Sequence, residues 1–277
     1  MFLSNLITGK EIFKMSKRTY FFLTVLFFFL ASFLPSVSQA AEIGKGVKIT
    51  YLGHSAFKLV APQGTIVYID PFLKNNPKTP ADQKEVDKAD LILATHGHGD
   101  HLGDTLAIAQ KTNAPAVVIV ELAAYLTKKG LKNVVRMNKG GSYTTKGIRI
   151  TMVNAQHSSS ITEGQQEIYA GEPAGFIIRL ENGFTVYHAG DTAVMSDMKI
   201  FGDLYKPNLV LLPIGSHFTM DPNEAAYDCK LLRPQYVVPI HYGTWPVLTG
   251  TAEEFSKLMK EQPDVKLIIM NPGQTIE

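Results

Sequence analysis

The chain has 277 residues with 27 basic and 25 acidic side chains, a formal net charge of +2, and is long enough for one large domain or two small ones. No basic patch and no acidic tail is present, which excludes the usual electrostatic signature of a nucleic-acid partner. The single cysteine, Cys229, excludes an intramolecular disulfide and lies in a helical pattern, where we expect a small buried apolar side chain.

The first 40 residues differ from the rest of the chain and predict a secretory signal peptide. Three lysines and an arginine precede a 15-residue apolar run at 20–34, and the small residues Ser38 and Ala40 form a cleavage site. Without this segment the chain carries 23 basic and 24 acidic residues. The basic pI of the whole chain therefore does not describe the charge of the part that follows the segment. Met15 is an alternative start, because a compact signal would also begin there.

This segment predicts that the functional part of the protein is exported. We expect a periplasmic location, cleavage after Ala40 and a functional domain over residues 41–277. An apolar run of 15 residues is marginal for crossing about 30 Å of hydrocarbon, so membrane contact is expected only if the segment stays uncleaved. No cysteine directly follows the apolar run, which argues against a lipoprotein.

From Val47 onward, short apolar strands alternate with single helices. In the first half, strands are expected over 47–51, 56–60, 65–69, 90–94, 116–120 and 148–153. One helix is expected from an Asp104 cap to about Lys111. A second is expected over 121–129, where Gly130 ends it.

The second half follows a long polar loop over 156–172, a length that indicates a functional loop. A hairpin is expected across Asn182-Gly183, and its strands and the later ones lie at 174–180, 185–187, 208–212, 236–240 and 266–270. Asp221-Pro222 begins one helix, and the capping box at 251–254 begins the last. A few strands followed by one or two helices in each half predict an α/β fold of two sheets packed face to face, with helices outside.

The most informative motif is THGHGDH at 95–101, directly after the expected strand at 90–94. It places His96, His98, Asp100 and His101 within six residues, a combination that suits zinc and other borderline divalent cations. We expect the cluster on the loop at the C-terminal end of that strand, where open α/β sheets usually place their ligands. The two glycines allow a tight turn, so the first two histidines can face one metal while the other two side chains serve a second.

Three further candidate ligands also follow predicted strands. His157 follows the strand at 148–153, Asp191 follows the strand that contains Tyr187, and His241 directly follows the strand that ends at Ile240. Together with the motif, they supply five imidazoles and two carboxylates. That is enough for two metals with one carboxylate bridging them.

Four more polar residues lie near these positions. Asp70, in a strand-end Asp-Pro, is expected to hold the histidine loop by hydrogen bonds, as carboxylates behind ligand imidazoles do. His54 is open between substrate contact and structural hydrogen bonding, and His217 is a candidate to line the pocket. His188 is expected to be a buried, hydrogen-bonded histidine.

The motif at 95–101 is the H-x-H-x-D-H signature of the metallo-β-lactamase superfamily, which the sequence resembles from Val47 to its end. Further motifs resemble one branch of it, the poorly characterised metal-dependent hydrolases similar to L-ascorbate-6-phosphate lactonases. These motifs lie at 52–57, 69–72, 157–160, 188–192, 212–215 and 239–242.

This resemblance implies a four-layer αββα sandwich with the metals at one edge between the sheets. It implies that His96, His98 and His157 bind the first metal. Asp100, His101 and His241 then bind the second metal, and Asp191 bridges the two. An exported form departs from this branch, which puts an intracellular phosphorylated substrate in doubt.

The expected chemistry is hydrolysis of a small-molecule substrate. Two divalent metals about 3.5–4 Å apart lower the pKa of a shared water towards ~7, and the resulting hydroxide would attack an ester, lactone, amide or phosphoester. Asp100 or Asp191 would accept or relay the proton. No Gly-x-Ser-x-Gly elbow is present, which removes the usual serine-hydrolase interpretation.

The ligands alone do not fix the metal or the substrate. Zinc is expected, with manganese, nickel and iron as alternatives, because availability as well as affinity selects the metal. Specificity is expected to come from the loops at 154–173 and 215–221, whose sequences do not name a substrate.

Other functions of the same residues stay open. An iron-dependent dioxygenase of this fold would use similar ligands, whereas the flavodiiron type places Glu where this chain has His98. A non-catalytic periplasmic metal-binding protein would also need many histidines, but these are arranged for an exchangeable water. A β-lactamase would fit the compartment, although the resemblance indicates another branch.

Overall fold

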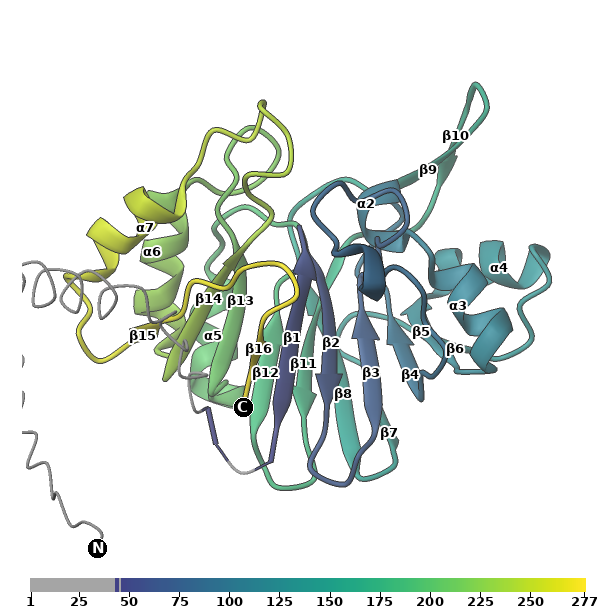
Figure 1. Ribbon diagram of the computed structural model, residues 1–277, viewed down its shortest axis with the longest axis horizontal. Coiled ribbons are helices and arrows are strands. Elements are labelled where there is room, and N and C mark those ends of the chain that lie inside the picture. The colour runs from purple at the N-terminus through teal and green to yellow at the C-terminus, as the bar shows by residue number, and fades with distance from the viewer. Residues whose placement is uncertain (1–42, 45) are drawn as a thin grey trace, which may run out of the picture. The chain divides into compact units, whose positions relative to one another are not determined.

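The computed structural model describes residues 43–44 and 46–277, in which two seven-stranded sheets face each other (Figure 1). The predicted signal peptide lies outside these residues. Within them, no helix combines the length and the apolar character needed to cross a membrane.

The first sheet is built mainly from the N-terminal half of the chain. Its strand order is β16-β1-β2-β3-β4-β5-β6, antiparallel from β16 to β3 and parallel from β3 to β6. Its strands are β1 (Lys48–Gly53), β2 (Ala56–Val60), β3 (Ile66–Ile69), β4 (Leu91–Leu93), β5 (Ala116–Ile119), β6 (Val134–Met137) and β16 (Thr275–Ile276).

The second sheet takes its strands from the C-terminal half. Its order is β15-β14-β13-β12-β11-β8-β7, antiparallel from β7 to β12 and parallel from β12 to β15. Its strands are β7 (Ser142–Thr145), β8 (Ile148–Asn154), β11 (Ala174–Arg179), β12 (Thr185–His188), β13 (Leu209–Pro213), β14 (Tyr236–Ile240) and β15 (Lys266–Leu267).

Helices cover the outer faces of both sheets, which completes the four αββα layers (Figure 1). The first sheet is covered by α3 (Thr105–Thr112) and α4 (Val120–Lys128), and the second by α5 (Asp197–Tyr205), α6 (Pro222–Leu232) and α7 (Ala252–Met259). The short helix α2 (Gly99–Leu102) and the 3-10 turn η2 (Ala81–Gln83) lie in connections.

Side chains of the second sheet alternate between two apolar cores, as the period of a strand requires. In β11, Phe176 and Ile178 face the core between the sheets, while Ile177 packs against the helices. In β12, Val186 faces inward and Tyr187 packs outward against α5. Because both faces are covered, β13 and β14 are apolar and almost fully buried along their length, and polar candidate residues come after the strand ends.

Most predicted strands and helices are confirmed, with small shifts at their ends. Asp221 caps α6, accepting from the Glu224 amide while the Glu224 side chain accepts from the Asp221 amide. Cys229 is buried in that helix. Asp104 stands at the start of α3, but its side chain is not the cap that we expected. It accepts hydrogen bonds from the amides of Leu73 and Lys74 instead.

The expectation of an unstructured loop over 156–172 is wrong. Residues 160–169 form the hairpin of β9 (Ser160–Glu163) and β10 (Gln166–Tyr169), which projects at the upper right of Figure 1. Ile161 pairs with Ile168, and these two apolar side chains in a polar segment were too weak a pattern to predict strands. The sequence also failed to predict α2, α5, β6, β7 and β16, and the last predicted strand shortens to β15.

Candidate metal centre

The seven predicted ligands meet at one edge of the sandwich, where strands from both sheets end. His96 and His98 follow β4, with Asp100 and His101 on α2 directly after them. The other three come from the second sheet: His157 follows β8, Asp191 follows β12 and His241 follows β14. We expected all four motif residues on a loop, but residues 99–102 are helical. The loop after β4 therefore ends at His98, and Asp100 and His101 lie on α2.

Asp191 stands at the centre of this cluster and is almost fully buried. Its Oδ2 lies 3.1 Å from Nε2 of His241, 3.2 Å from that of His101, 3.5 Å from that of His157 and 3.9 Å from that of His96. One carboxylate oxygen thus faces histidines that belong to both sheets.

Three histidines form a group on one side of Asp191. Nε2 of His96 lies 3.0 Å from Nδ1 of His98, and the ring of His157 lies 5.2 and 5.1 Å from the rings of these two residues. Their ligand atoms all lie within 4.8 Å of one another. This is a donor set of three imidazoles.

A second group lies on the other side and has four members. It consists of Asp100, His101, His241 and His54, whose ligand atoms again lie within 4.8 Å of one another. Oδ2 of Asp100 is 3.1 Å from Nε2 of His54 and 3.9 Å from Nε2 of His241. The structure therefore brings His54 among the candidate ligands, a place that sequence reasoning did not assign to it.

Asp70 and Thr95 fix the orientation of the histidine motif. Oδ2 of Asp70 accepts from Nδ1 of His101 at 2.7 Å and from the hydroxyl of Thr95 at 2.8 Å, while its Oδ1 accepts from the Thr95 amide. The same Thr95 hydroxyl lies 3.0 Å from Nδ1 of His96. Asp70 thus makes the hydrogen bonds that its expected role requires, and Thr95 extends them to a second candidate ligand.

Two residues of the loop after β14 were missed by the sequence analysis. The hydroxyl of Thr244 lies 2.8 Å from Nδ1 of His54, and the half-buried ring of Trp245 lies 4.8 Å from the His54 ring. Ser159 was missed as well, and its hydroxyl accepts from the Gly97 amide within the histidine motif. These partners are up to 190 residues apart in the chain, so no local pattern indicates them.

The backbone is strained where site residues leave their strands. His54, Asp70 and His241 have φ angles of 60°, 45° and 56°, in the left-handed region. Such conformations cost roughly 1–3 kcal/mol each for residues other than glycine and persist where the surroundings enforce them. Here the His241 amide donates to the His54 carbonyl at 2.9 Å, which ties two of these positions together.

The electrostatics of the cluster favour the neutral form of three imidazoles and the charged forms of His101 and Asp191. Burial lowers the pKa of His98 and His157 and holds that of His96 well below its ordinary value. Burial alone would raise the pKa of Asp191, but the nearby His101 and His241 hold it well below its usual range. Although burial opposes it, the carboxylates of Asp191 and Asp70 hold the pKa of His101 well above its ordinary value.

This donor set fits divalent cations. Imidazole nitrogens and carboxylate oxygens bind zinc, manganese, iron and nickel. Oδ1 of Asp191 is buried without a hydrogen-bond partner, an unfavourable state that a cation would relieve. The carboxylates of Asp70 and Asp191 lie on either side of the His101 ring, at 2.7 and 3.2 Å from its nitrogens, so negative charge is gathered at this place.

Two other histidines lie outside the cluster. His188 is fully buried, with Nδ1 accepting from the Gly190 amide and Nε2 2.9 Å from the Ser55 carbonyl, so both ring nitrogens are used. His217 is exposed, and its ring packs edge-on against Phe218. The structure therefore does not bring His217 to the candidate ligands.

Comparisons with known proteins agree with this geometry. Residues 65–242 match the family described as the beta-lactamase superfamily domain. A UPF0173 metal-dependent hydrolase of Koribacter versatilis is 49% identical over 231 residues, 83% of this chain and 98% of the relative. Another, from Methanopyrus kandleri, is 47% identical over 232 residues, 83% of this chain and all of the relative.

The chain belongs to the UPF0173 metal-dependent hydrolases of the metallo-β-lactamase superfamily. A solved structure supports this: Igni18, a metallo hydrolase from Ignicoccus hospitalis, aligns with a TM-score of 0.73 at 38% identity, over 83% of this chain and 97% of that chain. The superfamily resemblance and the sandwich fold are confirmed. The similarity to L-ascorbate-6-phosphate lactonases stays a prediction.

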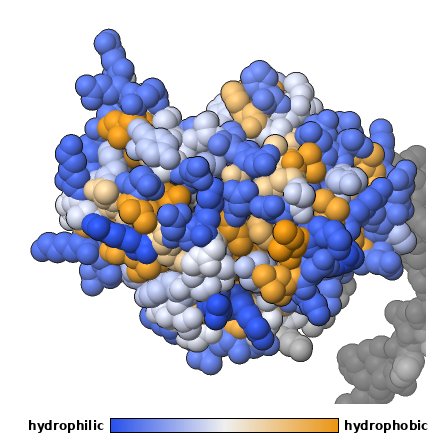
Figure 2. All heavy atoms as spheres, turned by 180° about the vertical axis from the view of Figure 1, so that it is seen from behind, coloured by the Kyte–Doolittle hydropathy of each residue, from blue (hydrophilic) through white to orange (hydrophobic). Residues whose placement is uncertain are grey.

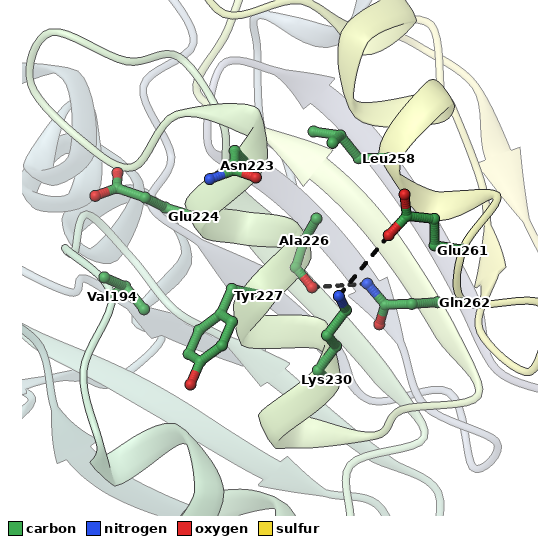
Figure 3. A pocket seen from close by; sticks show the side chains of 9 residues that line it. All are labelled: Val194, Asn223, Glu224, Ala226, Tyr227, Lys230, Leu258, Glu261 and Gln262. Carbon is green, nitrogen blue, oxygen red and sulfur yellow. Dashed lines mark hydrogen bonds and ion pairs between the residues drawn. The ribbon is translucent and has the colours of Figure 1, made fainter.

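A cavity of about 250 Å³ between α6 and α7 of this UPF0173 hydrolase lies apart from the cluster (Figure 3). Its wall includes the contacts that join the helices, Gln262 Nε2 to the Ala226 carbonyl at 2.7 Å and Lys230 to Glu261 at 4.0 Å. None of its nine lining residues is a candidate ligand. We therefore assign the cavity to helix packing.

The surface around the UPF0173 fold is mixed in character. Figure 2 shows the face that is turned away from the viewer in Figure 1, and hydrophobic and hydrophilic side chains are interspersed over it. The tip of the β9–β10 hairpin is hydrophilic, with the sequence TEGQQE at 162–167. Glu163 pairs with Lys129 and Tyr125, which ties the hairpin to α4.

Proposed function

We propose that this protein hydrolyses an ester, lactone, amide or phosphoester bond of a small molecule, using two divalent cations held side by side. The position of Asp191 supports this, because its Oδ2 lies within 3.1–3.9 Å of Nε2 atoms of four histidines from both sheets. A carboxylate shared by two donor groups is suited to bridging two cations.

The two donor groups divide the proposed ligands between the cations. His96, His98 and His157 would hold one cation, and Asp100, His101 and His241, three of the four members of the second group, would hold the other. Asp191 contributes to both. Zinc is the first expectation for such nitrogen and oxygen donors, with manganese, nickel and iron as alternatives.

When bound, a pair of cations supplies hydroxide near neutral pH and polarises the oxygen of the bond to be cleaved. Asp100 and Asp191 are the carboxylates available for the proton. We assign proton acceptance to Asp100, because its side chain is 26% exposed and that of Asp191 only 2%. Burial alone would raise the pKa of Asp100, but its contact with His54 and the charge of His101 hold it below its usual range, so it is ionised.

We also propose that the protein is exported and acts in the periplasm after cleavage at Ala40. The basic and apolar segments at its N-terminus support this. The matches to the two relatives span 231 and 232 residues, close to the length that would remain after cleavage.

The test is the metal content of protein purified without added metal, combined with assays on chromogenic lactone, phosphodiester and β-lactam substrates. We expect about two zinc or manganese ions per chain and hydrolysis of one substrate class. One iron per chain with oxygen uptake and no hydrolysis would replace the proposal by a dioxygenase. Two metals without turnover of any substrate would favour a non-catalytic metal-binding protein.

A further inference from the structure

His54 lies in the tight turn between two strands, yet it is buried and contacts several residues of the candidate metal centre. It connects β1 to β2 and is fully buried. Its ring lies 4.1 Å from that of His241 and 5.8 Å from that of His101. Its carbonyl accepts from the His241 amide and from the Tyr51 hydroxyl.

We propose that His54 is a further ligand of the second cation, through Nε2. The inference rests on the proposed dinuclear function and adds a donor to the set of Asp100, His101, His241 and the bridging Asp191. It gives the second cation five protein donors.

The distances in this group are those of neighbouring ligands. Two donor atoms at about 2.1 Å from one cation and at right angles to each other lie about 3.0 Å apart. Nε2 of His54 lies 3.1 Å from Oδ2 of Asp100, which is itself 3.9 Å from Nε2 of His241. One ring nitrogen of His54 also lies within 4.8 Å of a ligand atom of each of the other three members of the group.

The other ring nitrogen of His54 has the partner that a ligand histidine needs. Ligand imidazoles usually donate their second N–H to an oxygen that fixes the tautomer and the ring orientation. The Thr244 hydroxyl lies 2.8 Å from Nδ1 of His54, in a buried position. With the proton on Nδ1 and given to Thr244, the lone pair of Nε2 faces the donor group.

The competing role for His54 is to position Asp100 by a hydrogen bond. That role requires the opposite tautomer, in which Nε2–H donates to Asp100 and Nδ1 accepts from Thr244. The two roles predict different effects of substitution, because a glutamine can replace an N–H donor at this place but is a poor ligand for these metals.

Five protein donors also bear on the choice of metal. Zinc sites are mostly four-coordinate, with three protein ligands where an open position is kept. Five protein donors and one water make a six-coordinate site. Manganese prefers six-coordinate sites, so a fifth protein donor favours manganese over zinc at this position.

The test titrates metal-free protein with Mn²⁺ alone and measures stoichiometry and Kd by calorimetry. The variants are His54→Ala, His54→Gln and Thr244→Val, and the control is the exposed His217→Gln. We expect two Mn²⁺ per wild-type chain, with the second Kd raised more than about 100-fold by both His54 substitutions. That exceeds the roughly 10–100-fold effect of losing an outer hydrogen-bonding partner, which we expect for Thr244→Val.

Three results would overturn the inference. Recovery of the second Kd to within tenfold of wild type in His54→Gln would make His54 a positioning residue for Asp100. Two Mn²⁺ bound at unchanged Kd in His54→Ala would remove any role in binding. A wild-type protein that binds a single cation would overturn the dinuclear function as well, which separates that failure from the first two. Melting of the metal-free variants shows that they are folded when the titrations are compared.

Discussion

Oδ2 of Asp70 lies 2.7 Å from Nδ1 of His101, and both side chains are fully buried. Because the carboxylate also binds Thr95, whose hydroxyl contacts His96, one residue at the end of β3 orients a candidate ligand of each cation. The hydrogen bond leaves Nε2 of His101 directed toward Asp191. A carboxylate in this position fixes the tautomer and raises the basicity of the ligand.

Replacing Asp70 should therefore weaken metal binding without unfolding the protein. In Asp70→Asn, one carboxylate oxygen becomes an NH₂ group, so the side chain cannot accept the hydrogen bonds of His101 and Thr95 with the same strength. We expect the affinity for added Zn²⁺ or Mn²⁺ to fall about 10–100-fold. Competition with a chromophoric chelator measures this directly.

Asp104 provides a matched control for this substitution. Its carboxylate binds the amides of Leu73 and Lys74, in the same connection that contains Asp70, but it contacts no candidate ligand. We expect Asp104→Asn to lower the melting temperature and to leave the metal affinity within about threefold. Equal losses of affinity in the two variants would mean that Asp70 acts only on the stability of this connection.

Loss of a central ligand should abolish turnover while the fold is kept. His96→Ala and Asp191→Ala each remove a donor near the middle of the cluster, whereas the apolar cores are untouched. We expect hydrolysis at the level of the blank, with circular dichroism like that of the wild type. Full activity in metal-free His96→Ala protein would contradict the mechanism.

Gly97 and Gly99 of the histidine motif should respond differently to alanine. A Cβ at Gly97 would lie 2.4 Å from Cβ of Ala170, at the base of the β9–β10 hairpin, whereas a Cβ at Gly99 meets nothing within 4 Å. We expect Gly97→Ala to cost about 1–3 kcal/mol and to weaken metal binding, since the overlap displaces the motif.

Gly99→Ala serves as the matched control, because Gly99 is exposed at the start of α2. We expect its stability to change by no more than about 1 kcal/mol, in the stabilising direction. Thermal melting and metal titration of the two variants check both expectations. Equal behaviour would show that the hairpin does not constrain the motif.

Asp228 should make the protein less stable as the pH rises. Both of its carboxylate oxygens are buried without a hydrogen-bond partner, and burial, together with the nearby Glu224, raises its pKa to about 8. Between about pH 4 and pH 8 the folded protein holds a proton that the unfolded chain releases, so the free energy of unfolding falls across this window. The slope is roughly 1 kcal/mol per pH unit.

The variant Asp228→Asn should remove this slope. We expect the wild type to lose more stability than the variant between pH 5 and pH 8, in denaturant titrations at each pH. Asp203→Asn is the control, because that exposed carboxylate pairs with Lys199 and its pKa is lowered, which places its own transition below this window. Parallel curves for the wild type and Asp228→Asn would show that Asp228 is ionised in the folded protein at pH 5.

The sequence by itself determined the class of fold and indicated the kind of site. The spacing of His96, His98, Asp100 and His101 after an apolar strand is local, and it indicates a metal site without any knowledge of the fold. The strand that precedes His241 is a continuous apolar run, which predicts burial and places the following residue at a sheet end.

Only the tertiary structure decided which other groups complete the site. His54 meets Asp100 and Thr244, and Gly97 meets Ser159, because the two sheets and their loops pack together in one way. The β9–β10 hairpin and the buried Asp228 likewise depend on packing against other elements. Hydrogen bonds and ligand contacts between distant residues are set by the packed core, and no short-range pattern of polar side chains encodes them.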